Sequence, residues 1–209
     1  KPQSHKFSVA YIPRKAFRTK KLGMDILMGV AVNGIPFDPM AAEFYLGNHK
    51  GWQYNALGGA IPLGLDANYA HVQPSGAYHY HGLPVGLMQE LGWQAGRPSP
   101  LIGYAADGFP IFAMTAKVDG KVKRMRSSYR LKPGNRPGGS KPSGPHDGSF
   151  INDYEYVRGA GDLDACNGVK VTTPDYPNGV YAYFLTRKFP VVPRCLVGKI
   201  GKGFKKARR

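Results

Sequence analysis

Short runs of apolar or alternating residues, each bounded by turn-forming residues, recur along this sequence. Val180–Leu185 is rich in β-branched and aromatic side chains and follows the turn signal Pro177-Asn178-Gly179. Asn33-Gly34 and Asp107-Gly108 are turn signals of the kind that connect neighbouring strands. The pattern predicts a mainly β protein in which short strands follow tight turns.

Helical periodicity is weak by comparison. Only Asp38–Leu46 has the signs of a short helix, with Asp38 as the cap, Pro39 at the first helical position and Glu43 nearby. Lys132–Gly148 contains four prolines and is expected to form an exposed loop. We therefore expect long loops rich in glycine and proline, and at most one or two short helices.

Three short strings occur twice in the chain, in the same order. The pairs are Asn33–Phe37 with Asp107–Ile111, Leu65–Asn68 with Leu163–Asn167, and Pro74–His81 with Pro177–Phe184. The shared order favours an internal duplication. It predicts a single compact domain of two related β-rich halves, copy one at about 29–84 and copy two at about 107–198, with residues 117–145 as a basic loop inserted in copy two. The alternative is that many β-rich proteins share such turn and strand strings.

The composition argues against some classes of protein. Glycine and proline account for 28 and 18 of the 209 residues, which argues against a helical bundle. No uncharged apolar stretch reaches the roughly 18 residues needed to span a bilayer. Residues 1–30 lack the charged, apolar and cleavage segments of a signal peptide, so if the protein is exported, its signal is absent from this chain.

Positive charge is concentrated in three blocks. The formal net charge is +16, and residues 1–21, 117–145 and 199–209 contain 22 of the 29 cations. We expect a basic N-terminal arm at 1–27 and a basic C-terminal tail at 199–209 on either side of a domain at 28–198. Such a field attracts anionic polymers and surfaces in general, including nucleic acid, glycans and lipid. The candidate polyanion-binding residues are Lys199, Lys202, Lys205, Lys206, Arg208 and Arg209.

The chain has two cysteines, Cys166 and Cys195. Two thiols cannot form a four-thiolate zinc site, so the remaining alternatives are a disulfide, two free thiols or part of a mixed metal site. We expect the disulfide, which closes a loop of about 30 residues and indicates an oxidising compartment.

Tyr78-His79-Tyr80-His81 is the string that most suggests chemistry. In a strand, alternate side chains face opposite sides, so His79 and His81 share one face and the two tyrosines share the other. Two imidazoles on one face can bind one copper or zinc ion, with His71 as the expected third ligand. His49 and His146 are more distant alternatives. Copy two has Ala182 and Phe184 where copy one has the two histidines, which indicates that the scaffold does not need imidazole there. The alternative is that the histidines are structural.

Other catalytic patterns are absent from the sequence. It contains no nucleophile elbow, no H-E-x-x-H and no phosphate-binding glycine loop. Asp107, Asp153 and Asp164 lie in turn-like strings, where turn formation explains an aspartate. The sequence leaves open whether the protein is an enzyme.

The string at 78–81, with Gly76 before it and Gly82 and Pro84 after it, resembles the signature of the YHYH domain family. Further similar blocks are Asp107–Ile111, Asp153–Val157, Gly161–Asp164, Cys166–Gly168, Phe189-Pro190 and Pro193–Cys195. The resemblance covers roughly residues 28–198 and implies the extent of the domain and export to the periplasm or the cell exterior. Where many relatives carry Cys-Asn-Gly-His, this chain has Asn68-Tyr69-Ala70-His71, so the resemblance implies no disulfide in the first copy.

Three functions are therefore predicted, in order. The first is an exported protein whose histidine cluster, His71, His79 and His81, binds copper or zinc for metal carriage or metal-dependent chemistry. The second is a polyanion-binding surface or matrix protein that uses its basic arms and has structural histidines. The third is an enzyme acting on an anionic polymer, with His79 or His81 as a general acid or base.

Overall fold

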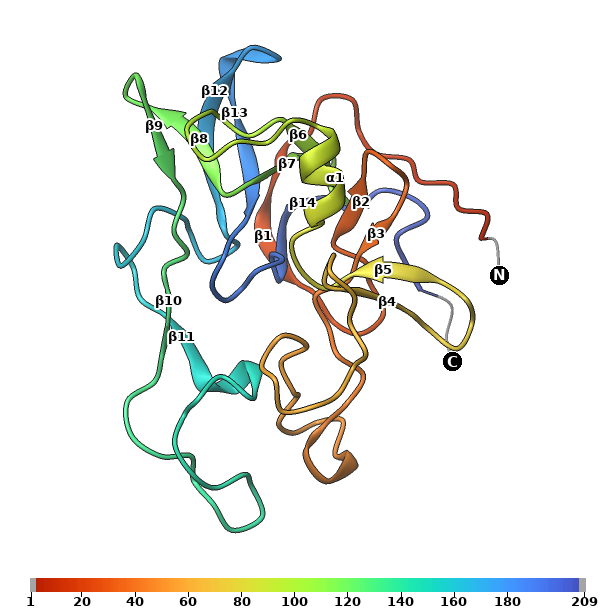
Figure 1. Cartoon of the computed structure of the whole chain (residues 1–209), viewed down its shortest axis with the longest axis vertical. Coiled ribbons are helices and arrows are strands. Elements are labelled where there is room, and N and C mark those ends of the chain that lie inside the picture. The colour runs from red at the N-terminus through yellow and green to blue at the C-terminus, as the bar shows by residue number, and fades with distance from the viewer. Residues whose placement is uncertain (1–2, 207–209) are drawn as a thin grey trace.

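The structure, a computed structural model, describes residues 3–206 and is mainly β, as predicted (Figure 1). Its elements, in chain order, are β1 (Lys15–Lys21), β2 (Gly29–Ala31), β3 (Pro36–Phe37), a 3-10 turn (Tyr45–Gly47), β4 (Ala70–Val72), β5 (Tyr78–Tyr80), α1 (Val85–Glu90), β6 (Leu101–Ala105), β7 (Pro110–Ala113), β8 (Thr115–Val118), β9 (Lys121–Arg124), β10 (Tyr129–Leu131), a second 3-10 turn (Ile151–Asp153), β11 (Tyr154–Tyr156), β12 (Gly168–Thr173), β13 (Tyr176–Leu185) and β14 (Cys195–Gly198).

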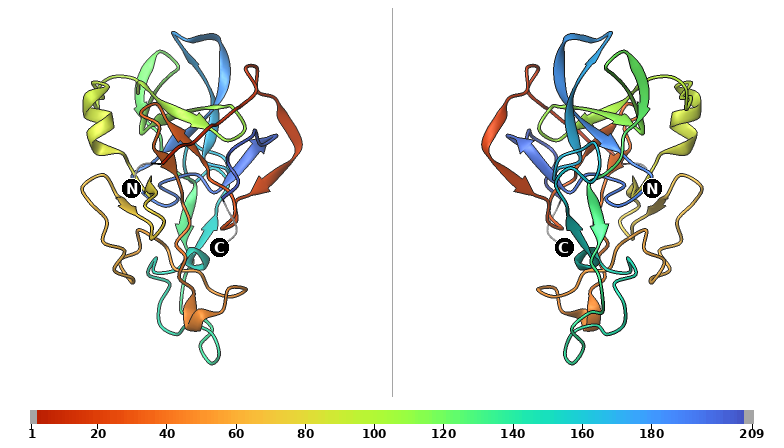
Figure 2. Two further views of the ribbon diagram at one scale, coloured as in Figure 1. Left: turned by 90° about the vertical axis from the view of Figure 1, so that its right-hand side faces the viewer. Right: turned by 90° about the vertical axis from the view of Figure 1, so that its left-hand side faces the viewer.

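An eight-stranded sheet forms the centre of the molecule. Its strand order is β12-β13-β7-β6-β2-β3-β5-β4, so the predicted histidine hairpin β4–β5 lies at one edge. The pairs β3–β5 and β7–β13 are parallel, and the other neighbours are antiparallel. Two-stranded ribbons surround this sheet, namely β1–β14, β8–β9 and β10–β11. Figure 2 shows α1 and β1 on opposite sides of the molecule.

The strand order repeats on the two sides of the central β2–β6 pair. One side continues β2-β3-β5-β4 and the other continues β6-β7-β13-β12. The registers also correspond: Phe37 pairs with Tyr80, and Ile111 pairs with Tyr183. These four residues occupy matching places in the repeated strings, so the register follows the repeats. Duplication as the origin of this correspondence remains a prediction.

Two glycines allow the central strands to meet. A Cβ at Gly29 would lie 2.4 Å from the carbonyl oxygen of Tyr104, and one at Gly103 would lie 2.3 Å from that of Val30. Each distance is far below van der Waals contact, so any larger residue would separate β2 from β6.

The helix predicted at Asp38–Leu46 does not form, and that prediction is wrong. The only helical residues of this stretch belong to the 3-10 turn that begins at Tyr45, whereas α1 lies elsewhere. Asp38 extends the sheet instead of capping a helix, because its N–H donates to the carbonyl oxygen of Tyr80 (2.9 Å) and its carboxylate is paired with Lys206.

The predicted loop at 132–148 has no helix or strand, but it is anchored to the fold. Arg136 within it is buried and donates to both carboxylate oxygens of Asp153, at 2.8 and 2.7 Å. The wider segment 117–145 is not one long loop. It contains the outer strand of the β8–β9 hairpin and β10, which pairs with β11.

The predicted C-terminal tail is part of the core as far as it is described, so that prediction is wrong for residues 199–206. Phe204 is fully buried and stacks on Phe7 with ring centroids 4.7 Å apart. Ser8 pairs with Lys202, and Ile26 pairs with Lys205, so both predicted arms take part in the fold. In the same way, β1 is paired with β14, although all seven of its residues are exposed.

The expected disulfide between Cys166 and Cys195 is present. It connects the turn before β12 to the first residue of β14. Among residues 3–206, no helix has the length and apolar character needed to cross a membrane.

Candidate metal centre

The β4–β5 hairpin brings the predicted histidines together. The turn closes through hydrogen bonds from Gly76 N to Gln73 O (2.7 Å) and from Gln73 N to Ala77 O (3.0 Å). The resulting register places His71 directly opposite His79. His81 follows two residues later, on the same face as His79.

The three imidazoles meet through their Nε2 atoms. Nε2 of His79 lies 3.0 Å from Nε2 of His81, which lies 3.2 Å from Nε2 of His71. His79 and His81 are buried, with exposed fractions of 3% and 4%, whereas His71 is partly exposed. Of the described residues, these three form a cluster of ligand atoms within 4.8 Å of one another.

Backbone carbonyls set the tautomers of two of these histidines. Nδ1 of His71 lies 2.7 Å from Leu63 O, and Nδ1 of His79 lies 3.2 Å from Ala77 O. A carbonyl oxygen only accepts hydrogen bonds, so each Nδ1 carries the hydrogen and each neutral ring directs an Nε2 lone pair into the cluster. Each of these two Nε2 atoms has its close contact with Nε2 of His81, whose buried Nδ1 has no hydrogen-bond partner among the described residues.

The spacing of the nitrogens fits one metal ion. Ligand atoms about 2.0–2.1 Å from a zinc or copper ion lie roughly 3.0–3.2 Å apart when the angle between them at the metal is about 95–105°. The two Nε2–Nε2 distances in the cluster fall within this range. Nε2 of His79 and Nε2 of His71 are therefore each spaced from Nε2 of His81 as two ligands of one ion would be.

The environment favours the neutral forms of His79 and His81, which are the forms that bind metal. Burial lowers the pKa of His79. Burial, with smaller contributions from His79 and His71, lowers the pKa of His81 to about 3. Protons therefore compete weakly with a metal for these nitrogens.

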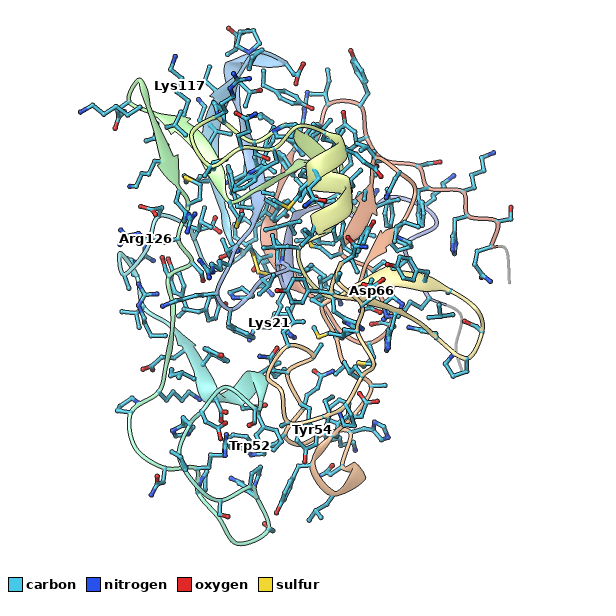
Figure 3. The ribbon with its side chains drawn as sticks, in the orientation of Figure 1. Lys21, Trp52, Tyr54, Asp66, Lys117 and Arg126 are labelled. Carbon is cyan, nitrogen blue, oxygen red and sulfur yellow. A yellow bond between two sulfur atoms is a disulfide. The ribbon has the colours of Figure 1, made fainter. Side chains whose placement is uncertain are left out.

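The two tyrosines of the same string serve the fold. Tyr78 donates a hydrogen bond to Asp66, whose position beside β4 and β5 is visible in Figure 3. Burial and the Asp66 carboxylate raise the pKa of Tyr78 to about 12. Tyr80 is buried and accepts a hydrogen bond from the Asn33 amide (2.9 Å). Neither phenol is available as a ligand.

The matching positions in the second half of the sheet are apolar. Val169 pairs with Ala182 as His71 pairs with His79, and Phe184 stands where His81 stands in the first half. Ala182 and Phe184 are fully buried in an apolar cluster, with Val169 packed against it. The same strand arrangement thus forms without imidazole.

Two alternatives named from the sequence lie outside the cluster. His49 contacts Phe44, and His146 is partly buried, stacks on Trp52 and bonds Gly134 O through Nδ1. Figure 3 shows Trp52 well below the β4–β5 hairpin. Neither histidine belongs to the three-imidazole centre.

Sequence reasoning missed a charged pair beside the centre. Asp38 is buried and forms an ion pair with Lys206. Asp38 raises the pKa of His79 and Lys206 lowers it, and the effect of Asp38 is the larger of the two. No sequence pattern predicts this ion pair, because 168 residues separate the two partners.

The candidate polyanion-binding residues are dispersed. Lys199, Lys202 and Lys205 are exposed, Lys206 is paired with Asp38, and Arg208 and Arg209 lie outside the described residues. A denser basic surface is formed by β1, where Lys15, Arg18, Lys20 and Lys21 are all exposed.

Comparison with known protein families matches residues 6–198 to the family described as YHYH protein. No curated protein and no solved structure matches the chain.

Proposed function

Because the chain belongs to the YHYH protein family, whose name-giving string Tyr78–His81 supplies two of the three clustered imidazoles, we propose that it binds one transition metal ion through His71, His79 and His81. The observation that carries this proposal is the convergence of three Nε2 atoms, two of which are unprotonated because their Nδ1 atoms face carbonyl oxygens.

Copper and zinc are the metals that best suit an all-imidazole site. Three protein ligands leave a coordination position free in a tetrahedral site, as in catalytic zinc centres. His71 is the most exposed of the three, so an external ligand would reach the ion from its side. The centre would serve metal carriage or metal-dependent chemistry, and when bound the ion supplies a Lewis acid or a redox centre.

We also propose that the protein works outside the cytoplasm. The Cys166–Cys195 disulfide is stable in an oxidising compartment and rare in a reducing one. Acid–base catalysis by the histidines is not part of the proposal, because a pKa near 3 makes His81 a poor proton carrier at neutral pH.

Metal analysis of protein purified without an affinity tag tests the metal site. The parent should retain about one copper or zinc ion per chain after dialysis. The variant His71→Val, His79→Ala, His81→Phe takes the residues of the second half, so it should fold and retain none. His146→Ala is the matched control because it removes an imidazole outside the centre, and this variant should bind metal as the parent does. Equal metal content in the folded triple variant would refute the proposal.

A second candidate function rests on β1. Its four exposed cations stand on one ribbon with Phe17, whose exposed fraction is 98%, so both the charge and an aromatic ring are available to a polyanion. We propose salt-sensitive, non-specific binding of anionic polymers to this ribbon. Replacing Arg18 and Lys20 with Gln should lower the salt concentration that elutes the protein from heparin, whereas Lys121→Gln with Lys123→Gln, on β9, should lower it less.

A further inference from the structure

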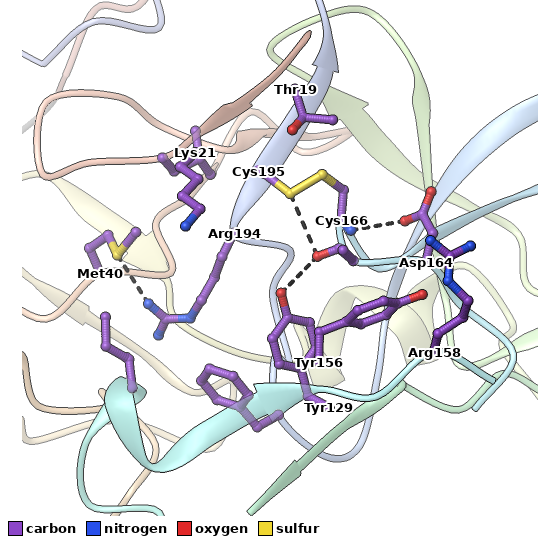
Figure 4. A pocket seen from close by; sticks show the side chains of 14 residues that line it. Thr19, Lys21, Met40, Tyr129, Tyr156, Arg158, Asp164, Cys166, Arg194 and Cys195 are labelled. Carbon is purple, nitrogen blue, oxygen red and sulfur yellow. Dashed lines mark hydrogen bonds between the residues drawn. A yellow bond between two sulfur atoms is a disulfide. The ribbon is translucent and has the colours of Figure 1, made fainter. Parts of the chain in front are cut away.

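A pocket lies away from the histidine centre. It has a volume of about 500 Å³ and is lined by residues that come from both ends of the chain and from the β10–β11 ribbon (Figure 4). The Cys166–Cys195 disulfide forms part of its wall, and none of the three clustered histidines does.

Arg194 extends into this pocket, between Met40 and Tyr129 (Figure 4). Its guanidinium donates to Pro39 O at 2.7 Å and contacts Met40 Sδ, a weak acceptor, at 3.0 Å. Within residues 3–206 it forms no ion pair. A guanidinium has five N–H groups in a planar fork, so most of its donors remain for a ligand. Burial also lowers the pKa of Arg194 to about 10.

Two further cations stand at the rim of the pocket. Lys21 and Arg158 are exposed, and neither forms an ion pair with any described residue. Asp164 is the only acid in the lining, but Cys166 N, Gly168 N and the Tyr181 hydroxyl already donate to its carboxylate. The lining therefore holds three cations, Lys21, Arg158 and Arg194, against one carboxylate, and so has excess positive charge.

Aromatic rings form the opposite wall. The ring of Tyr129 lies 5.6 Å from that of Phe189 and 5.7 Å from that of Tyr156, measured between centroids. Phe189 is already covered, because its ring stacks on that of Tyr154 (3.8 Å between centroids) and the guanidinium of Arg194 lies 5.1 Å from its centroid. Tyr129 and Tyr156 are the other aromatic residues of the lining. A ligand placed against Arg194 would therefore also contact flat apolar surfaces.

We propose that this pocket binds a small organic anion, a carboxylate with a flat apolar body. The carboxylate would take the free N–H groups of Arg194, assisted by Lys21 and Arg158, and the body would lie against Tyr129 and Tyr156. Planar, bidentate binding of a carboxylate is the interaction that a guanidinium performs best. The site is independent of the histidine centre.

Three probes separate the contributions of charge and apolar surface. Benzoate has both features, acetate has only the carboxylate, and benzyl alcohol has only the ring. Each is titrated into isotopically labelled protein, and amide chemical shifts are recorded by NMR. Benzoate should saturate, shift amides around Arg194 and Tyr129, and bind about tenfold more tightly than either of the other probes.

Variants then assign the binding to these residues. Arg194→Met should weaken benzoate binding at least tenfold. Arg194 also donates a hydrogen bond to Pro39 O, so its replacement could disturb the local fold. The variant Lys21→Gln, Arg158→Gln removes positive charge from the same pocket at exposed positions and should weaken benzoate binding several-fold. Lys121→Gln, at the tip of the β8–β9 hairpin, is the matched control and should have no effect.

If acetate bound as tightly as benzoate, charge alone would account for the binding. If benzyl alcohol bound as tightly as benzoate, the apolar surface alone would account for it. Either result, or the lack of saturation by benzoate, overturns the proposal. The variant His71→Val, His79→Ala, His81→Phe should still bind benzoate as the parent does, so failure of the metal site and failure of this pocket are distinguishable.

Discussion

A carbonyl oxygen beside Nδ1 of a neutral histidine fixes the hydrogen on Nδ1 and leaves Nε2 free to accept a hydrogen bond or bind a metal. Leu63 O and Ala77 O face Nδ1 of His71 and His79, so these rings present Nε2 as an acceptor. The alternation of residues along the strand predicts that His79 and His81 share a face. The carbonyl partners could not be predicted, because Leu63 belongs to a loop whose path no sequence pattern specifies.

The metal-free protein should lose stability as the pH falls from about 6.5 toward 3. The pKa of His81 is about 3 in the fold, and an unfolded histidine has a pKa of about 6.5, so in this range the unfolded chain binds a proton that the folded chain does not. The free energy of unfolding should therefore fall by up to about 1.4 kcal/mol per pH unit for this group. Urea melts at several pH values measure the slope, and the variant His71→Val, His79→Ala, His81→Phe should have a smaller one. An equal slope in that variant would assign the acid sensitivity to other groups.

Tyr183 and Tyr80 occupy matching places in the two halves, but we expect their hydroxyls to contribute unequally to stability. The Tyr183 hydroxyl donates to buried Asp107 at 2.7 Å and accepts from Val197 N at 2.7 Å. The Tyr80 hydroxyl accepts one hydrogen bond, from the side chain of the exposed Asn33. Tyr183→Phe leaves a buried carboxylate oxygen and a buried N–H without this partner, so it should cost about 2–3 kcal/mol of unfolding free energy, against about 1 kcal/mol or less for Tyr80→Phe. Chemical denaturation of both variants makes the comparison, and equal losses would contradict it.

At the scale of elements, the turns were predictable and the long-range partners were not. Asn33-Gly34 and Asp107-Gly108 do precede β3 and β7, because local backbone chemistry decides a tight turn. The predicted helix at Asp38 fails because a lysine near the far end of the chain pairs with the presumed cap. A contact between residues so far apart in the sequence produces no local pattern from which it could be predicted.

The C-terminal segment shows the same limit of sequence reasoning. Its alternation of lysine and glycine suggests a solvated tail, but Gly201 and Gly203 let it pass close to the N-terminal segment. A Cβ at these positions would lie 2.0 Å from Ser8 O and 2.1 Å from Lys6 O. One aromatic residue, Phe204, then fills the core position beneath Phe7.

Phe204→Ala should therefore destabilise the protein by about 3–5 kcal/mol, because it removes a fully buried ring and leaves a cavity. Thermal unfolding followed by circular dichroism measures the loss. Phe17→Ala is the control, since Phe17 is almost completely exposed and should change stability by less than about 0.5 kcal/mol. A small effect at Phe204 would restore the interpretation of a solvated tail.

At the scale of the whole molecule, we expect the disulfide to contribute to stability without affecting metal binding at the histidine centre. Cys166 precedes β12, which is one edge of the eight-stranded sheet, while the histidines stand at the other edge. Replacing both cysteines with alanine should lower the unfolding free energy by roughly 3–4 kcal/mol, as expected for a closed loop of about 30 residues. Metal content per folded chain should not change. Denaturation and metal analysis on the same sample test both statements, and loss of metal from a folded double variant would show that the two features are coupled.

The pairing of β1 with β14 also has a consequence for biosynthesis. The first strand of the described chain finds its hydrogen-bonding partner only at Cys195–Gly198, and Phe7 meets Phe204 later still. A ribosome releases residues in order, so β1 must wait, unpaired, until residues 195–198 have been made. Nascent chains arrested before residue 195 should therefore remain sensitive to protease at residues 15–21, and protection should arrive in one late step when the last strand emerges.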